Sequence, residues 1–385
     1  MMDGLHVALG VSGSIAAVKT VELAHELRRQ GARVRAVMTE SAADIIHPWA
    51  LEFATERDVI TEITGAVEHV ELCGREGWAD VLLLAPSTAN TVGKIAHAVD
   101  DTTVTTCATT ALGAGCPVVM APAMHEPMYD HPGVIDSLGR LDEWGIRMVD
   151  PRLEEGKAKI AKVETIVREV AREATASPLG GRTVVVTSGA TSEPLDPVRS
   201  LTTGSSGRTG RAIAEACYVA GAEVMVVHDG PALSYGRTEQ VTTAAEMLQV
   251  VEQVAPEADA LVSAAAIGDF TLAQRQSKIP SGEPMTLELD PTPKLLDEVR
   301  ASNPALAIVG FKAEVDLPTD QLVANARAQL ERIDGTFVVA NDAAVMGESE
   351  TACLLVTPDE VRQFEGSKGE LGRLVATTLA GELDG

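Results

Sequence analysis

The most constraining feature of the sequence is a short apolar segment from Ala79 to Leu84 that is bounded on both sides by polar residues. Such a segment is typical of a buried parallel strand, because parallel sheets are covered by helices on both faces. A small polar loop follows, and a helix is expected to open at Thr91. Ligands of open α/β sheets bind at the carboxyl ends of the strands, where hydroxyls and helix N–H groups converge. We therefore expect an α/β fold with chemistry at this edge.

A second loop of this kind follows the first predicted strand, residues 5–9. It reads Gly-Val-Ser-Gly-Ser, and the helix after it stops at Gly31 and leads into a strand that closes on Thr39. Glycines let the backbone approach a ligand, and serines at a helix start donate to anions, so the loop predicts a phosphate cradle. The dinucleotide fingerprint G-x-G-x-x-G is missing, and Glu40 follows its strand later than a ribose-binding acid would. NAD is therefore disfavoured.

The chain is longer than one hydrophobic core usually supports, since it has 385 residues. Residues 175–181 are small, polar and rich in proline and glycine, as a linker should be, and a new β-α-β pattern starts at residue 183. We predict two domains, residues 1–176 and 177–385. Both are expected to be doubly wound, Rossmann-like α/β domains.

The charge of the chain excludes some partners. It carries 56 acidic and 31 basic residues, for a net charge of −25. Nucleic acids and anionic membrane surfaces would be repelled. The acidic residues are spread along the chain rather than gathered in tails, which favours the solvated surface of a salt-adapted, halophilic protein over that of an ordinary acidic one.

The spacing of the cysteines and the length of the apolar runs indicate the cellular compartment in which we expect the protein. The five cysteines are odd in number and form no C-x-x-C pair, so neither a disulfide framework nor a zinc site is expected. No apolar run approaches the roughly 18 residues that a membrane span needs. We expect neither a signal peptide nor an anchor, and a cytoplasmic protein.

Several motifs follow one another along the first domain. They are G-V-S-G-S-I-A-A-V-K in the first loop, His69 ahead of the buried strand, A-P-S-T-A-N-T-V-G-K-I-A after it, and P-A-M-H-x-x-M-Y from Pro122. Together they resemble the flavin-dependent cysteine decarboxylases, which have a flavodoxin-like fold. The resemblance is greatest to the decarboxylase half of the bifunctional phosphopantothenoylcysteine decarboxylase/phosphopantothenate-cysteine ligases of coenzyme A biosynthesis.

This resemblance implies a decarboxylation that uses FMN without net redox change, because a flavin can serve as the electron sink. His69 would be the base for the initial oxidation, since an imidazole titrates near neutral pH. The positions that match those holding FMN in the family are Ser12, Gly13, Ser14, Thr39, Thr88, Ala89, Asn90, Thr91 and Ala123.

The chain departs from the family at the substrate. His125 stands where an asparagine holds the substrate carboxylate, and the flap segment, residues 154–161, lacks the cysteine that donates the last proton in many members. We expect Lys157 and Lys159 to contact the substrate instead, with desolvation lowering a lysine pKa enough for proton donation.

The second domain contains a long loop rich in hydroxyls and glycines over residues 187–210, followed by A-A-A-I-G-D-F from Ala264, G-F-K-A-E from Gly310 and V-A-N-D from Val339. Together these motifs resemble the ligase half of the same family. The resemblance implies that CTP activates 4'-phosphopantothenate as an acyl-cytidylate, which cysteine then attacks, and that Mg²⁺ accompanies the triphosphate. Lys278 matches the catalytic lysine, and Thr203 replaces an asparagine that contacts the acyl intermediate. The positions expected to bind the nucleotide are Asp269, Lys278, Gly310, Phe311, Lys312, Ala313 and Arg332.

Two other functions remain open at this point. The first is a non-catalytic flavin-binding regulatory protein, and the presence of His69 argues against it. The second is a nicotinamide oxidoreductase, and the missing G-x-G-x-x-G fingerprint argues against that one. The family also implies a homo-oligomer, with trimers of the decarboxylase domain and dimers of the ligase domain. The ligands of any protein-bound metal cannot be read from the sequence.

Overall fold

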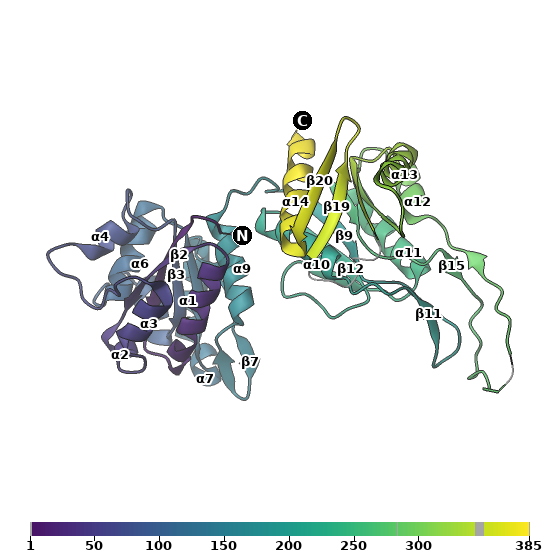
Figure 1. Ribbon diagram of the computed structural model, residues 1–385. Helices are drawn as coiled ribbons and strands as arrows, with labels where there is room; N and C mark the ends of the chain where they lie inside the picture. The colour runs from purple at the N-terminus through teal and green to yellow at the C-terminus, as the bar shows by residue number, and fades with distance from the viewer. Residues whose placement is uncertain (1, 283, 343–349, 385) are drawn as a thin grey trace. The chain divides into compact units, whose positions relative to one another are not determined.

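The computed structural model describes residues 2–282, 284–342 and 350–384 (Figure 1). It divides into two compact units, Met1–Ala176 and Ser177–Gly385. Each unit is built on a mainly parallel sheet with helices on both faces, which confirms the predicted α/β, doubly wound fold class. No helix in these described ranges is both long enough and apolar enough to cross a bilayer.

The first unit contains a five-stranded parallel sheet in the order β2-β1-β3-β4-β6. Its strands are β1 (His6–Val11), β2 (Arg33–Met38), β3 (Val81–Ser87), β4 (Val118–Pro122) and β6 (Arg147–Met148). The helices are η1 (Ile15–Lys19), α1 (Thr20–Arg29), α2 (Glu40–Ala43), α3 (Pro48–Thr55), α4 (Glu68–Cys73), α5 (Ala89–Ala96), α6 (Thr103–Ala114), α7 (Glu126–Tyr129), α8 (Pro132–Glu143) and α9 (Val163–Ala174).

The predicted buried strand is β3, in which every residue is buried. It continues to Ser87, and α5 opens at Ala89 rather than at Thr91. The reason is a helix cap, because the Thr91 N–H donates to the Thr88 side chain at 3.2 Å and so fixes the first turn earlier. The polar loop is therefore shorter than predicted.

A small antiparallel sheet in the order β5-β8-β7 lies beyond β4. It consists of β5 (Met124–His125), β7 (Arg152–Glu154) and β8 (Lys157–Lys159). The hairpin of β7 and β8 turns at Glu155 and Gly156, both with positive φ. The segment predicted as the flap thus pairs with the strand that carries His125.

The second unit has an eight-stranded sheet in the order β13-β12-β9-β14-β17-β18-β19-β20, of which the last two strands are antiparallel. These are β9 (Thr183–Ser188), β12 (Glu223–His228), β13 (Arg237–Gln240), β14 (Ala260–Ser263), β17 (Ala307–Glu314), β18 (Phe337–Asp342), β19 (Glu350–Val356) and β20 (Val361–Ser367). On one face pack α10 (Arg208–Val219) and α14 (Lys368–Asp384). The other face is covered by α11 (Ala244–Val254), α12 (Leu295–Ser302) and α13 (Thr319–Arg332), and η2 (Ala255–Glu257) follows α11.

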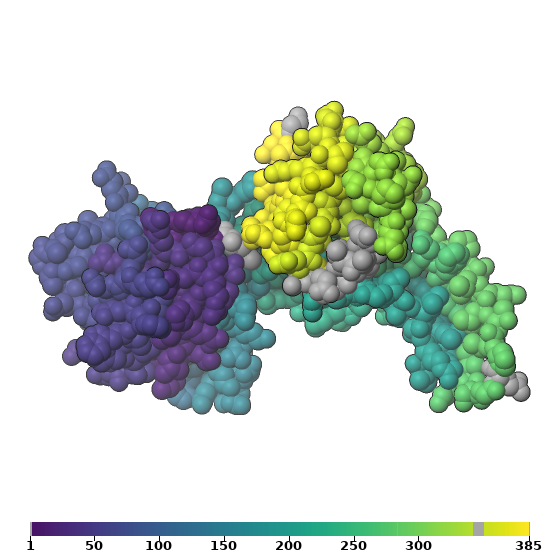
Figure 2. Space-filling view, viewed as in Figure 1, coloured from purple at the N-terminus to yellow at the C-terminus, as the bar shows by residue number. Residues whose placement is uncertain are grey.

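Two arms extend from the second unit, as Figures 1 and 2 show. One is the hairpin of β10 (Ser192–Pro194) and β11 (Ser200–Thr202). The other runs between the paired strands β15 (Phe270–Thr271) and β16 (Asp290–Pro291). The arms lie side by side, since the Arg275 N–H donates to the Leu195 carbonyl oxygen at 3.0 Å.

The close packing of α10 against α14 depends on Gly372. A Cβ at this position would lie 2.5 Å from the carbonyl oxygen of Ala212, a backbone atom that cannot move aside alone. Gly381 lies in the same helix, and a Cβ there would meet open space. The two glycines therefore form a matched pair for testing the helix contact.

We expect Gly372→Ala to lower the free energy of unfolding of the second unit by about 1–3 kcal/mol, the usual cost of overpacking. Gly381→Ala should instead raise it by up to about 1 kcal/mol, because alanine favours a helix. Urea unfolding of the full chain measures both changes. Equal effects of the two substitutions would show that the contact between the helices is not close.

Candidate functional sites

Hydrogen bonds join the predicted cofactor loops of the first unit at the carboxyl edge of its sheet. The Ser12 hydroxyl donates to the Pro86 carbonyl oxygen at 2.7 Å and accepts from the Thr88 N–H at 3.0 Å. The Ser14 hydroxyl reaches the Ala123 carbonyl oxygen at 3.4 Å. The Thr39 N–H donates to the Val11 carbonyl oxygen at 3.1 Å. All nine residues predicted to hold the cofactor therefore lie in loops, or in the first turn of α5, at one edge of the sheet.

These nine residues differ in exposure. Ser12 is 1% exposed and its only hydroxyl proton is already donated, so it shapes the loop rather than facing a ligand. Thr39, Thr91 and Ala123 are also buried. The accessible positions are Gly13, Ser14, Thr88 and Ala89, which are half-buried, and Asn90, which is exposed.

Gly13 is needed for close approach of two loops. A Cβ at this position would lie 2.3 Å from the Ser41 hydroxyl oxygen. Ser41 follows Thr39, whose side chain accepts from the Ala42 N–H at 3.2 Å and so caps α2. The glycine thus lets the loop after β1 lie against the start of α2.

His69 lies in α4, which packs against α6. Its Nδ1 atom is buried and has no hydrogen-bond partner among the described residues. Within the same ranges, no hydrogen bond joins His69 to the nine loop residues. The first residue of α6, Thr103, donates to the Met38 carbonyl oxygen at 2.5 Å, so α6 begins beside the Thr39 loop. A buried ring nitrogen without a protein partner is uncommon and is compatible with a polar contact to a bound molecule.

The flap places one predicted lysine opposite His125. In the antiparallel pair of β5 and β8, His125 is the register partner of Lys157, and the Glu126 N–H donates to the Gly156 carbonyl oxygen at 3.1 Å. Both His125 and Lys157 are exposed. The two predicted substrate residues therefore lie opposite each other in the small antiparallel sheet, which is separate from the main sheet.

The prediction for Lys159 is wrong in one respect. Its ammonium group donates to Glu155 at 2.8 Å and to Glu154 at 3.4 Å. The hydrogen bond to Glu155, and then the charges of both carboxylates, raise the pKa of Lys159 instead of lowering it. Desolvation is the weaker influence here, so Lys159 is a poorer proton donor than an ordinary lysine.

The thiols of the first unit lie away from the flap. Cys73 and Cys107 are buried in the core between α4 and α6, and the hydrogen bond between them together with burial raises the pKa of Cys73. Cys116 precedes β4 at the amino edge of the sheet, opposite the loops, and burial raises its pKa. None of the three cysteines of the first unit therefore replaces the missing flap thiol.

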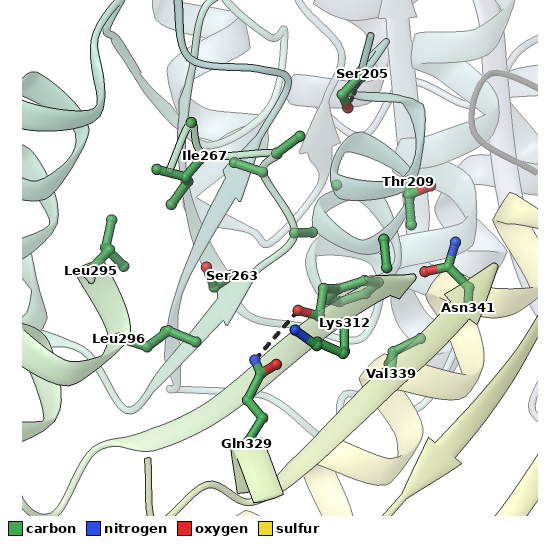
Figure 3. A pocket seen from close by; sticks show the side chains of 18 of the residues that line it. Ser205, Thr209, Ser263, Ile267, Leu295, Leu296, Lys312, Gln329, Val339 and Asn341 are labelled. Carbon is green, nitrogen blue, oxygen red and sulfur yellow. Dashed lines mark hydrogen bonds between the residues drawn. The ribbon is translucent and has the colours of Figure 1, made fainter. Parts of the chain in front are cut away.

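The second unit contains a cavity of about 360 Å³ at the carboxyl edge of its sheet (Figure 3). Its walls include the glycine-serine loop before α10, the segment from Ser263 to Asp269, and residues of β17 and β18. Five cations and a single carboxylate, that of Asp269, are among the described residues that line it. The cations are Arg208, Lys294, Lys312, Arg332 and Lys368.

Several predicted nucleotide residues line this cavity, namely Asp269, Phe311, Lys312, Ala313 and Arg332. Gly310 does not. It is buried within β17, where a Cβ would lie 2.7 Å from the Gln329 side-chain nitrogen. Its role is to let Gln329 approach and donate to the Phe311 carbonyl oxygen at 3.4 Å (Figure 3).

Two further predicted residues lie outside the cavity wall. Lys278 is exposed on the arm between β15 and β16, and Thr203 is exposed beyond β11, where its hydroxyl donates to the Ala266 carbonyl oxygen at 3.2 Å. The contact to Ala266 brings Thr203 to the cavity rim. Lys278 is not brought to the cavity by the single chain, and its role stays a prediction.

The sequence prediction missed three of the cavity cations. Arg208 directly follows the glycine-serine loop, and Lys294 follows the turn at Pro291 to Pro293, so both positions carried a local signal. Lys368 carried none, because it reaches the cavity only when β20 and α14 fold back over the sheet. The described residues contain no group of three or more His, Cys, Asp or Glu side chains placed to hold a metal ion.

Comparisons with known proteins cover both units. Residues 1–175 match the family described as Flavoprotein, and residues 179–382 match the DNA/pantothenate metabolism flavoprotein C-terminal domain. Three relatives carry the name coenzyme A biosynthesis bifunctional protein CoaBC. That of Thermococcus kodakarensis is 47% identical, over 94% of this chain and 91% of its own. Those of Methanocaldococcus jannaschii (97% and 93% covered) and Bacillus subtilis (90% and 88%) are each 34% identical.

A buried carboxylate fixes the arm that carries Lys278. Asp196 is 2% exposed and accepts hydrogen bonds from the N–H groups of Ile279 (3.0 Å), Val198 (2.8 Å) and Arg199 (2.9 Å). The Arg199 side chain also bonds Asp196 and the Ile279 carbonyl oxygen, both at 3.1 Å. The bond from Ile279, with those from Val198 and Arg199, lowers the pKa of Asp196 below its ordinary value of 3.8.

A carboxylate whose pKa is lowered by folding stabilises the fold above its ordinary pKa, and this stabilisation is lost as the pH falls through the lowered value. We expect Asp196→Asn to speed hydrogen exchange of the Ile279 amide several-fold at pH 7. In the unchanged protein, hydrogen exchange of the Ile279 amide should become faster only below about pH 3.8. Asp290→Asn, at an exposed position of the same arm, is the control. Unchanged protection of Ile279 would mean that other contacts hold the arm.

Proposed function

The chain belongs to the family of bifunctional coenzyme A biosynthesis proteins, and from this membership we propose a reaction for each unit. The protein is an enzyme with a decarboxylase and a ligase activity. In our proposal the second unit joins cysteine to 4'-phosphopantothenate at the expense of CTP. The first unit then decarboxylates the resulting 4'-phosphopantothenoylcysteine to 4'-phosphopantetheine.

The ligase proposal is supported above all by the charge of the cavity in the second unit. Its wall holds five cations although the whole chain has a net charge of −25. Such a concentration of positive charge stabilises the phosphates of a nucleoside triphosphate and the charge that develops as pyrophosphate leaves. We propose that CTP binds here, and that Mg²⁺ enters with the triphosphate, because Mg²⁺ is usually held by substrate phosphates and few protein groups.

For the first unit we propose FMN as the bound flavin. The loops after β1, β2, β3 and β4 converge at one edge, and the N–H groups at the start of α5 lie beside the exposed Asn90. A helix start of this kind suits the phosphate of a mononucleotide. The flavin supplies the electron sink that decarboxylation of an acylated cysteine needs. In this proposal Gly13, Ser14 and Asn90 contact the cofactor, whereas Ser12 and Thr39 hold the loops in place.

The substrate residues of the first unit come from the flap and α4. We propose that His69 removes the proton that must leave the substrate, because its buried Nδ1 has no protein partner among the described residues. His125 and Lys157, which are register partners, supply a hydrogen-bond donor and a positive charge for the anionic groups of the substrate. A non-catalytic flavin-binding role is not favoured, because the relatives that cover nearly the whole chain are bifunctional biosynthetic proteins.

We also propose that the enzyme is a homo-oligomer, with trimeric contacts through the first unit and dimeric contacts through the second. Large apolar side chains on the first unit support this proposal, since Ile15, Trp49 and Phe53 are more than 70% exposed. Exposed apolar side chains of this size are typical of surfaces that bind another protein. Sedimentation of the full chain and of residues 177–385 would separate the two contacts.

His69→Asn should slow release of CO2 from 4'-phosphopantothenoylcysteine by a factor of about 10² to 10⁴, the usual contribution of a general base. Flavin content, measured by visible absorbance, should not change. His97→Asn removes the exposed imidazole of the residue that follows α5 and should have little effect. Near-normal turnover of the His69 variant would refute the assignment.

Lys278→Gln should lower the rate of cysteine ligation by about 10² to 10³, as removal of one group that stabilises developing charge does. Decarboxylation of supplied 4'-phosphopantothenoylcysteine should stay intact. Arg275→Gln, three residues earlier on the same arm, is the matched control. Near-normal ligation by the Lys278 variant would refute the assignment, whereas loss of both activities together would indicate a folding defect.

A further inference from the structure

Three histidines of the first unit stand at the N-cap position of a helix, and they differ in what their rings do. His47 caps α3 and His131 caps α8, because the Nδ1 atom of each accepts a backbone hydrogen bond, from Trp49 at 3.3 Å and from Gly133 at 3.1 Å. His125 precedes α7, but its ring does not cap that helix and forms no hydrogen bond or ion pair within the described residues. The imidazole of His125 is therefore available to a bound molecule.

His125 lies on the charged face of the small antiparallel sheet. Side chains alternate between the two faces of a strand, and residues directly opposite each other share a face. His125 in β5 lies opposite Lys157 in β8, and Lys157 lies opposite Glu154 in β7. All three side chains are exposed, whereas the next residue of β8, Ala158, is buried on the other face. His125 and Lys157 thus point in the same direction.

This face is close to the edge where the cofactor loops meet. Ala123 is held at that edge, since its N–H donates to the Ser87 carbonyl oxygen at 2.9 Å and its carbonyl oxygen accepts from the Ser14 hydroxyl at 3.4 Å. His125 follows Ala123 by two residues, which span at most about 7 Å. A molecule that extends from the cofactor edge towards the flap therefore passes within reach of the His125 ring.

The proposed decarboxylation requires the protein to supply one proton. The bond between the carboxyl carbon and the α-carbon of the cysteinyl group breaks, and its electron pair stays on the substrate, where the oxidised neighbouring carbon and its sulfur accept it. The hydride that the neighbouring carbon lost in the initial oxidation returns to that carbon afterwards. The α-carbon itself must gain a proton, because a hydrogen takes the place of CO2. Without a donor, the product is an ene-thiol with two hydrogens fewer than the saturated thiol.

Two other side chains near the flap hold their protons too firmly for this step. The hydrogen bond to Glu155 raises the pKa of Lys159. Burial, and then the charges of Asp150 and Asp130, raise the pKa of Tyr129, the last residue of α7. An imidazole in general releases and regains a proton near neutral pH, whereas ordinary amines and phenols do so only at much higher pH.

We propose that His125 donates the proton that the α-carbon of the substrate gains after CO2 has left. The inference rests on the proposed decarboxylase function of the first unit. The cationic ring first attracts the substrate carboxylate, together with Lys157. Once CO2 has departed, a ring N–H bond breaks as the new C–H bond forms, and the neutral ring regains a proton from water after the product leaves.

The test is His125→Asn, because asparagine keeps a side-chain N–H for the carboxylate but has no proton to release. This variant should still release CO2, but formation of 4'-phosphopantetheine should fall by a factor of about 10² or more. Mass spectrometry should find the ene-thiol, two hydrogens lighter, in its place. His131→Asn is the matched control and should form the saturated thiol at a near-normal rate, since asparagine also caps helices well.

A second measurement does not depend on turnover. The ring signals of His125 and His131 are followed by NMR in the full chain with labelled histidine, before and after addition of 4'-phosphopantetheine. The His125 signal should shift when this product binds, and the His131 signal should stay where it is. An unmoved His125 signal in the presence of bound product would show that the ring does not reach the substrate, and the proposal would fall.

Other outcomes also decide the assignment. Normal formation of the saturated thiol by His125→Asn would refute it, as would loss of CO2 release, which would place His125 at an earlier step. Accumulation of the ene-thiol by Lys157→Met, but not by His125→Asn, would assign the proton to Lys157. If His125→Asn does not fold, His125→Gln carries the same test. If the unchanged protein released no CO2 from 4'-phosphopantothenoylcysteine, the proposed decarboxylase function itself would fail.

Discussion

Both units depend on the burial of parallel strands between two layers of helices. Each connection crosses one face of the sheet and returns the chain to the same starting edge, so the carboxyl ends of all the parallel strands meet at the opposite edge. In the first unit this brings Ser12, Thr39, Thr88 and Ala123 into adjacent loops. In the second unit it opens the cavity beside β14, β17 and β18. The positions of both sites are thus consequences of the fold before any specific side chain is considered.

Local patterns in the sequence predicted the fold class and the edge at which the cofactor loops meet. They were sufficient there because strand burial and helix capping are decided by residues close in the chain, as Thr88 shows at the start of α5. They failed where the outcome depends on how the chain folds back on itself. The pKa of Lys159 is raised by its hydrogen bond to Glu155, which the hairpin turn brings back to it, and Lys368 lies at the cavity only because the last strand and helix fold back over the sheet. The role of Asp196 also needed the structure, because its partner Ile279 is more than eighty residues away.

The chain as a whole is acidic, whereas the wall of the cavity in the second unit is rich in cations. The chain carries 25 more negative than positive charges, yet the cavity wall of the second unit holds five cations and one carboxylate among its described residues. Three of these cations are paired with carboxylates just outside or at the rim, which fixes their side chains in place. This distribution of charge is consistent with our proposal that the cavity takes a small phosphorylated molecule.

The antiparallel pairing of β8 with β5 fixes which flap side chain lies opposite His125. In this pair His125 lies opposite Lys157, while the turn at Glu155 and Gly156 places Glu154 opposite Lys157 in β7. Side chains alternate between the two faces of a strand, so slipping β8 by one residue would turn Lys157 away and present Ala158 in its place. A slip of one residue between β5 and β8 would therefore replace a charged side chain opposite His125 with an apolar one, whereas a slip of two residues would keep the same face and place Lys159 or Glu155 there.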